Sequence, residues 1–159
     1  MTFSSSSILD NFDRIAGVPI AGMVFASVLS YKLSKPFLYI KTATETHGRE
    51  KKIEGMLAPG DRGLVVDDLV ASGKSLLETS SLVRGEGATV SDALVLVDRE
   101  EGGVENLAKV GVKLHAFAKT SEIVKELYES NLIDKRYLEI VDKRASEGPD
   151  SETTAVSPD

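Results

Sequence analysis

Residues 63–75 place two carboxylates and a loop of small residues directly after a short apolar run. The run at 64–66 is typical of a buried parallel strand, and Asp67 and Asp68 end it. A turn follows at Ala71, Ser72, Gly73, Lys74 and Ser75. Open α/β sheets bind ligands at the carboxyl ends of their strands. Amides at a helix start favour phosphate, and paired carboxylates can hold a sugar diol or magnesium. A phosphorylated sugar satisfies both halves of this pattern.

A histidine in a basic, polar segment is the second candidate. Residues 41–52 lack apolar periodicity and predict a mobile loop. A histidine in such a loop is usually just exposed, but His47 is flanked by Lys41, Arg49, Lys51 and Lys52. A loop of this composition could close over an anionic ligand and exclude water. The other histidine, His115, lies in an apolar run, which favours a structural role.

Two weaker candidates follow other predicted strands. Arg99 comes just after the apolar run at 93–97. It is either a surface arginine paired with Glu100 or Glu101, or a guanidinium fork for a substrate carboxylate. Residues 17–22 predict a strand, a turn and a helix start, and their glycines allow close backbone approach to a diphosphate.

The triplet at 73–75, Gly-Lys-Ser, resembles the end of a nucleotide-binding P-loop. That loop needs a glycine five positions before Gly73, where this chain has Asp68. The pattern therefore disfavours a nucleoside triphosphatase.

Strand and helix patterns alternate along the chain, which predicts a doubly wound, mostly parallel sheet. We expect strands near 14–18, 37–40, 64–66, 93–97 and 113–117. We expect helices at 21–33, 76–84, 104–110, 122–130 and 135–143. A short N-terminal segment at 1–12, one domain at 13–145 and a disordered tail at 146–159, rich in Ser, Glu, Thr and Pro, complete the expected organisation.

The composition limits the function classes. The chain has 159 residues, enough for one domain with a core. A net charge of −6 argues against general nucleic-acid binding. The absence of cysteine excludes disulfides and thiolate metal sites. No apolar run suits a membrane span, and the polar start does not resemble a signal peptide, so we expect a cytoplasmic protein.

Taken in order, these pieces resemble the type I phosphoribosyltransferases, and more narrowly the orotate phosphoribosyltransferases, including the form fused into UMP synthase. The matching segments are 15–22, 39–48, 53–55, 65–75, 77–79 and 92–103, followed by Lys113-Leu114-His115. The resemblance covers about 13–141. It implies the type I fold, with the family's N-terminal hood largely absent here. It also implies a shared-site homodimer, with neither nucleic acid nor membrane as partner.

The resemblance implies a Mg²⁺-dependent reaction of orotate with phosphoribosyl pyrophosphate (PRPP) that gives orotidine 5′-monophosphate and pyrophosphate, a step of UMP biosynthesis. Asp67 and Asp68 would hold the ribose hydroxyls and, directly or indirectly, the metal. Catalysis would involve Asp68 and His47, the latter from the neighbouring subunit. Orotate would meet Arg99 and Ser72. The remaining PRPP contacts would come from Ile20, Ala21, Lys41, Ala71, Ser72, Gly73, Lys74 and Ser75.

Four loop residues depart from the family pattern. Lys41 and Thr42 stand where the family has an Arg-Lys pair, and Glu45 stands at the position of a catalytic lysine. Ala71 replaces a usual threonine. A glutamate beside a departing anion disfavours turnover. Two alternatives therefore stay open: a PRPP-binding regulator or partner subunit, and a phosphoribosyltransferase for another base.

Overall fold

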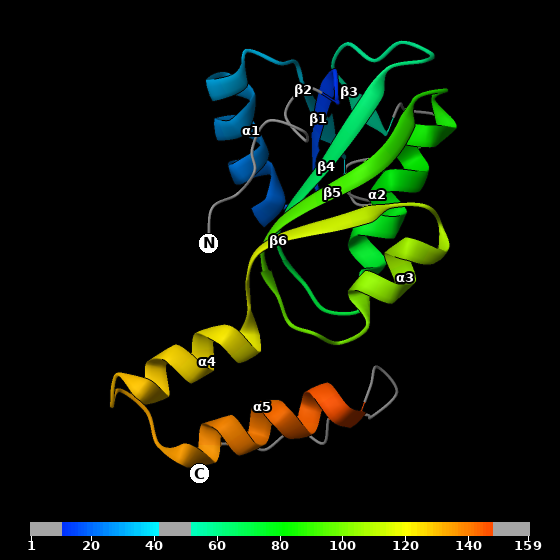
Figure 1. Ribbon diagram of the computed structural model, residues 1–159. Helices are drawn as coiled ribbons and strands as arrows, with labels where there is room; N and C mark the ends of the chain where they lie inside the picture. The colour runs from blue at the N-terminus through cyan, green and yellow to red at the C-terminus, as the bar shows by residue number, and fades with distance from the viewer. Residues whose placement is uncertain (1–10, 42–51, 148–159) are drawn as a thin grey trace.

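Six strands form one twisted sheet in the computed structural model, which describes residues 11–41 and 52–147 (Figure 1). The strands are β1 (Arg14–Gly17), β2 (Phe37–Ile40), β3 (Ile53–Glu54), β4 (Arg62–Val70), β5 (Thr89–Asp98) and β6 (Lys113–Lys119). Their order across the sheet is β3-β2-β1-β4-β5-β6. Every neighbouring pair is parallel except β2 and β3. The mostly parallel sheet predicted from the alternating pattern is confirmed, and the antiparallel edge strand is an addition to it.

Helices cover both faces of the sheet. They are α1 (Ala21–Leu33), α2 (Lys74–Gly85), α3 (Gly103–Lys109), α4 (Thr120–Glu129) and α5 (Lys135–Glu147). Figure 1 shows α1 on one side of the sheet and α2 and α3 on the other. Two buried apolar clusters match these layers. Leu64 and Val66 of β4 pack with Ala26 of α1, whereas Val65 packs with Leu76 and Val83 of α2. The alternation follows from the period of two along a strand.

The predicted end of β4 is wrong. The strand continues to Val70, so Asp67 and Asp68 lie within it rather than after it. The reason is that Asp67, Leu69 and Val70 keep their pairing with Val95, Val97 and Asp98 of β5. Polar side chains do not end a strand while its backbone still has a partner.

The last two helices form a hairpin beyond the end of β6 (Figure 1). No residue of α4 is buried, and Leu132, Tyr137 and Ile140 are exposed. The helix α5 includes Ser146 and Glu147, two residues past the expected start of the tail. Residues 148–159 lie outside the described part of the chain, as do 1–10 and 42–51.

No loop separates β6 from α4. The backbone amide of Lys119 donates to Oε2 of Glu122 at 3.2 Å. The hydroxyl of Thr120 donates to the carbonyl oxygen of Asp98 at 3.3 Å, and the amide of Ser121 donates to Oε2 of Glu100 at 3.0 Å. The hairpin is thus bonded to the last residue of β5 and to the segment that follows it.

Within 11–41 and 52–147, no helix is both long and apolar enough to cross a membrane.

Candidate functional site

A cavity of about 360 Å³ lies at the carboxyl ends of the neighbouring strands β1 and β4. It brings together most of the predicted site residues from two distant parts of the sequence. Its walls are Pro19, Ile20, Ala21, Asp67, Asp68, Leu69, Val70, Ala71, Ser72, Gly73, Lys74, Ser75 and Leu76. The carboxyl ends of adjacent parallel strands are where a doubly wound sheet binds ligands.

The loop at 71–73 turns sharply into α2. Gly73 has φ of 83°, a left-handed conformation that glycine adopts without steric cost. The helix starts at Lys74, and its N-cap residue Gly73 has no side chain that could accept hydrogen bonds from the first amides of α2. Such a helix start, with a lysine as its first residue, favours an anion.

The start of α3 packs against this loop. A Cβ atom on Gly103 would lie 2.6 Å from the carbonyl oxygen of Ala71, so only glycine fits there. Nδ2 of Asn106 donates to the carbonyl oxygen of Ser72 at 3.0 Å. Sequence reasoning missed both positioning residues. The Gly-Gly pair at 102–103 was a signal for close approach, whereas nothing in the sequence singles out Asn106.

Asp67 is a buried carboxyl group, only 8% exposed. Its burial raises its pKa to about 7, and the neighbouring carboxylate of Asp68 also raises it. Hydrogen bonds from the backbone amides of Asp68, at 2.9 Å, and of Gly22 act in the opposite direction. The balance leaves a carboxyl group that can be protonated, and so can donate a hydrogen bond, near neutral pH.

Helix α1 approaches Asp67 very closely at Gly22. A Cβ atom there would lie 2.5 Å from the carbonyl oxygen of Val66 and 2.8 Å from Oδ1 of Asp67. The missing side chain lets the first turn of α1 lie directly against β4. This contact brings residues 20–21 and Asp67 to one cavity.

Asp68 is half-buried and lines the same cavity. Its Oδ1 accepts a hydrogen bond from the amide of Leu69 at 2.8 Å. Within the described ranges 11–41 and 52–147, no group of three or more acidic, histidine or cysteine side chains could hold a metal by itself. Two carboxylates without a third side-chain ligand instead suit a magnesium ion that takes its other ligands from water or from a bound molecule.

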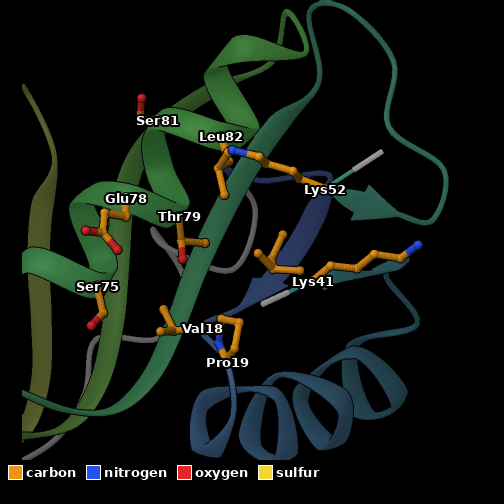
Figure 2. Close-up of a pocket in the computed structure, with 10 residues that line it drawn as sticks. Val18, Pro19, Lys41, Lys52, Ser75, Glu78, Thr79, Ser81 and Leu82 are labelled. Atoms are coloured by element: carbon orange, nitrogen blue, oxygen red, sulfur yellow. The ribbon is translucent and has the colours of Figure 1, made fainter. Parts of the chain in front are cut away.

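A second cavity, of about 520 Å³, adjoins the first, since Pro19 and Ser75 line both. Figure 2 shows Ser75, Glu78 and Thr79 of α2 on one side, with Lys41 and Lys52 across from them. Lys41 lines this second cavity, and its Nζ lies 2.7 Å from Oε1 of Glu54. The structure thus places Lys41 next to the carboxylate cavity but not in its walls.

The remaining predicted residues lie elsewhere. Arg99 lines neither cavity and pairs with Glu101, with Nη2 to Oε1 at 2.7 Å, as the surface interpretation predicts. Its amide donates to the carbonyl oxygen of Val70, so its backbone adjoins the site strand.

The two histidines are placed differently. His115 pairs with Asp92 at 2.7 Å, which agrees with a structural role. His47, Thr42 and Glu45 lie outside the described residues.

The sheet, the uncapped helix start and the paired carboxylates together define an α/β protein of the kind that binds sugar phosphates or nucleotides. The sequence profile described as "Phosphoribosyl transferase domain" matches residues 2–130. The chain belongs to this family. Its expected fold is thereby confirmed.

Within this family, the chain is similar to orotate phosphoribosyltransferases and to a UMP synthase. The chain is 42% identical over 137 residues to the orotate phosphoribosyltransferase of Sulfolobus acidocaldarius, covering 83% of this chain and 69% of that one. It is 38% identical over 125 residues to the orotate phosphoribosyltransferase of Cenarchaeum symbiosum, covering 79% and 62%. It is 36% identical over 131 residues to bovine uridine 5′-monophosphate synthase, covering 82% and 27%. The chain thus spans under two thirds of the Cenarchaeum relative's length.

Solved structures with a similar fold come from the same group of proteins as these relatives. The Leishmania donovani UMP synthase matches with a TM-score of 0.75 at 31% identity, over 86% of this chain and 29% of that one. The Aeropyrum pernix orotate phosphoribosyltransferase matches with a TM-score of 0.70 at 37% identity, over 77% and 68%.

Proposed function

We propose that this protein is an orotate phosphoribosyltransferase, which transfers the phosphoribosyl group of PRPP to orotate in UMP biosynthesis. The observation that carries the proposal is the cavity of about 360 Å³ that unites the paired carboxylates, the 71–75 loop and residues 20–21. The similarity to relatives named orotate phosphoribosyltransferase supports this choice of reaction.

Each part of PRPP has a chemically suitable partner in this cavity. The loop at 71–75 would receive the 5′-phosphate at the start of α2. Asp67 and Asp68 would bind the ribose hydroxyls, Asp67 as donor or acceptor because its pKa is about 7. Ile20 and Ala21, with Lys41 from the adjoining cavity, would border the diphosphate. His47, which lies outside the described residues, would act from the neighbouring subunit, as the family resemblance implies.

The reaction forms a bond between a ring nitrogen of orotate and C1 of the ribose, and it breaks the bond from C1 to pyrophosphate. The protein's contribution is to align the two reactants and to stabilise the departing anion. Ser72 and Arg99 would contact orotate, with Arg99 exchanging Glu101 for the substrate carboxylate. When bound, Mg²⁺ neutralises diphosphate charge, and Asp67 and Asp68 would hold it directly or through water.

We also propose a homodimer with shared sites in the cytoplasm, whose partners are small molecules rather than nucleic acid or a membrane. The catalytic domain would begin at residue 13 and include α5, which ends at Glu147 rather than at the expected boundary of 145. The net charge of −6 supports the absence of nucleic acid among the partners.

Pyrophosphate release from purified protein, orotate, PRPP and Mg²⁺ tests the proposal. We expect release that requires orotate and falls roughly 10- to 100-fold in Asp68→Asn, since a charged hydrogen bond is worth about 1.5 to 3 kcal/mol. Asp134→Asn, far along the chain on the exposed hairpin, is the matched control and should keep full activity. No release above a blank at high protein concentration would contradict the proposal.

A PRPP-binding protein without turnover is the second candidate. Two observations favour it: Arg99 is paired with Glu101, and Glu45 stands where the family has a lysine. Calorimetry separates the two functions, because this candidate binds PRPP without releasing pyrophosphate. A panel of other bases in the same assay tests the third alternative, a different acceptor.

A further inference from the structure

The ion pair of Arg99 and Glu101 lies beside the carboxylate cavity. Nη2 of Arg99 is 2.7 Å from Oε1 of Glu101, and the two side chains are 42% and 29% exposed. The amide of Arg99 donates to the carbonyl oxygen of Val70, which belongs to the cavity wall. In this paired state Arg99 lines neither cavity. The pair therefore holds a guanidinium group at the edge of the site rather than in it.

The backbone before Glu101 is held in place. Asp98 is buried, and its Oδ1 accepts a hydrogen bond from the amide of Glu100 at 2.8 Å. Glu100 has a φ of 60°, a left-handed conformation that is uncommon outside glycine. Its Oε2 accepts from the amide of Ser121 at 3.0 Å, and its Oε1 lies 3.8 Å from Nζ of Lys119. Glu100 is thus bonded through its amide and through its carboxylate, and it cannot turn without breaking these bonds.

The backbone after Glu101 is held as well. Gly102 is the N-cap residue of α3, and its carbonyl oxygen accepts from the amide of Asn106 at 3.1 Å. Gly103 packs on the 71–73 loop so closely that a Cβ atom would lie 2.6 Å from the carbonyl oxygen of Ala71. Glu101 therefore projects from a backbone that is fixed on both sides. The parts that can rotate are the two paired side chains, because both reach the solvent.

We propose that Glu101 is an internal competitor for the carboxylate of the acceptor, a positioning residue that acts through Arg99. The inference rests on the proposed function, in which Arg99 contacts orotate. Arg99 must leave Glu101 before it binds that carboxylate, so one carboxylate replaces another of equal charge. The exchange needs only side-chain rotation, since the backbone is held on both sides. The apparent affinity for the acceptor is then lower than the intrinsic affinity, in proportion to the fraction of Arg99 that is unpaired.

The competitor acts on the product as well as on the substrate. The reaction keeps the carboxylate, so orotidine 5′-monophosphate presents the same group to Arg99 as orotate does. Without a competitor, Arg99 would hold both molecules more tightly, and tighter binding of a product slows its release. Glu101 recaptures Arg99 and thereby favours departure of the nucleotide.

Calorimetric titration with two nucleotides tests the proposal, because orotidine 5′-monophosphate and uridine 5′-monophosphate differ only in the carboxylate. We expect Glu101→Gln to bind orotidine 5′-monophosphate roughly 2- to 6-fold more tightly than the wild type, the gain when an exposed ion pair no longer competes. Its affinity for uridine 5′-monophosphate should not change. Glu105→Gln, which removes an exposed carboxylate four residues further along the chain, is the matched control and should leave both affinities unchanged.

A second pair of variants shows whether Glu101 acts through Arg99. Arg99→Gln should weaken the binding of orotidine 5′-monophosphate. Adding Glu101→Gln to that variant should change nothing further, because the competitor has no other target. The melting temperature of Glu101→Gln should stay that of the wild type, since its side chain is partly exposed.

Equal or weaker binding of orotidine 5′-monophosphate by Glu101→Gln would overturn the proposal, since Glu101 would then not compete for Arg99. So would an equal gain for uridine 5′-monophosphate, which would be a general effect of charge. If the wild type releases pyrophosphate from orotate and PRPP, either result leaves the proposed function standing. A wild type that neither binds these nucleotides nor releases pyrophosphate would contradict the proposed function, and this inference with it.

Discussion

Asp67 connects the chemistry of the site to the stability of the fold. Its pKa is about 7 in the folded protein, against an ordinary value of 3.8, because burial disfavours the charged form. Below pH 3.8 the group is neutral in both states. As pH rises from about 4 to 7, the unfolded chain releases this proton while the folded protein keeps it. Folding stability contributed by this group is therefore lost over that range.

We expect Asp67→Asn to remove the loss of folding stability that Asp67 causes as the pH rises from about 4 to 7. The unfolding free energy of the wild type, relative to the variant, should fall by roughly 2 to 4 kcal/mol between pH 4 and pH 8. Urea unfolding at several pH values measures it. Asp134→Asn removes an exposed carboxylate and should keep the wild-type pH dependence. Parallel curves for the wild type and Asp67→Asn would show that the burial of Asp67 does not control this pH dependence.

Asn106 positions the 71–75 loop through one hydrogen bond to the carbonyl oxygen of Ser72. We expect Asn106→Ala to raise the KM for PRPP about 2- to 10-fold, equivalent to the roughly 0.5 to 1.5 kcal/mol of a neutral hydrogen bond. Lys109→Met is the control, because Lys109 contacts Oδ1 of Asn106 and leaves the bond to Ser72 intact. Steady-state kinetics measures the KM of both variants. Equal KM values for Asn106→Ala and Lys109→Met would contradict a loop-positioning role for Asn106.

At the residue scale, the sequence predicted the residues that line the carboxylate cavity but not the residues that position them. Asp67, Asp68 and the 71–75 loop were recognisable because acids and small residues follow an apolar run. The raised pKa of Asp67 was not, because it depends on burial beneath α1. Lys41 was expected among the PRPP contacts, and its ion pair with Glu54 could not be predicted because the pairing of β2 with β3 supplies that partner.

Among the elements, α1 and β4 are in direct backbone contact at Gly22. We expect Gly22→Ala to push them apart and to destabilise the fold by about 1 to 3 kcal/mol, as overpacking does. Gly85→Ala is the matched control, since its Cβ would meet nothing within 4 Å, and it should be neutral or slightly stabilising. Thermal melting of the two variants compares them. Similar melting temperatures would mean that α1 shifts without cost.

Element boundaries were predictable where local pattern and tertiary pairing agree. The bounds of α1 and β2 match the prediction residue for residue. The strand β4 was predicted too short because its last residues are polar or mixed, and only β5 keeps them in the sheet. The two-residue strand β3 had no signal of its own, since its only partner is β2.

For the whole molecule, stability should be uneven. No residue of α4 is buried, and the hairpin reaches the sheet chiefly through β6. Its amides should therefore exchange with solvent through local opening, at a free energy a few kcal/mol below that of β4 and β5. Hydrogen exchange followed by mass spectrometry measures the difference. Equal protection throughout would indicate that the hairpin unfolds only with the sheet.

The junction between β6 and α4 links the hairpin to the segment around Arg99. Thr120 and Ser121 bond to Asp98 and Glu100, the two residues that flank Arg99. Under the proposed function, a ligand that draws Arg99 away from Glu101 would also act on this junction, and thermodynamic reciprocity requires the reverse. An antibody fragment that binds α4 and is coupled to Arg99 would change the affinity for such a ligand by the same factor by which the ligand changes the affinity of the antibody. A fluorophore on that helix would report the binding of such a ligand without touching the cavity.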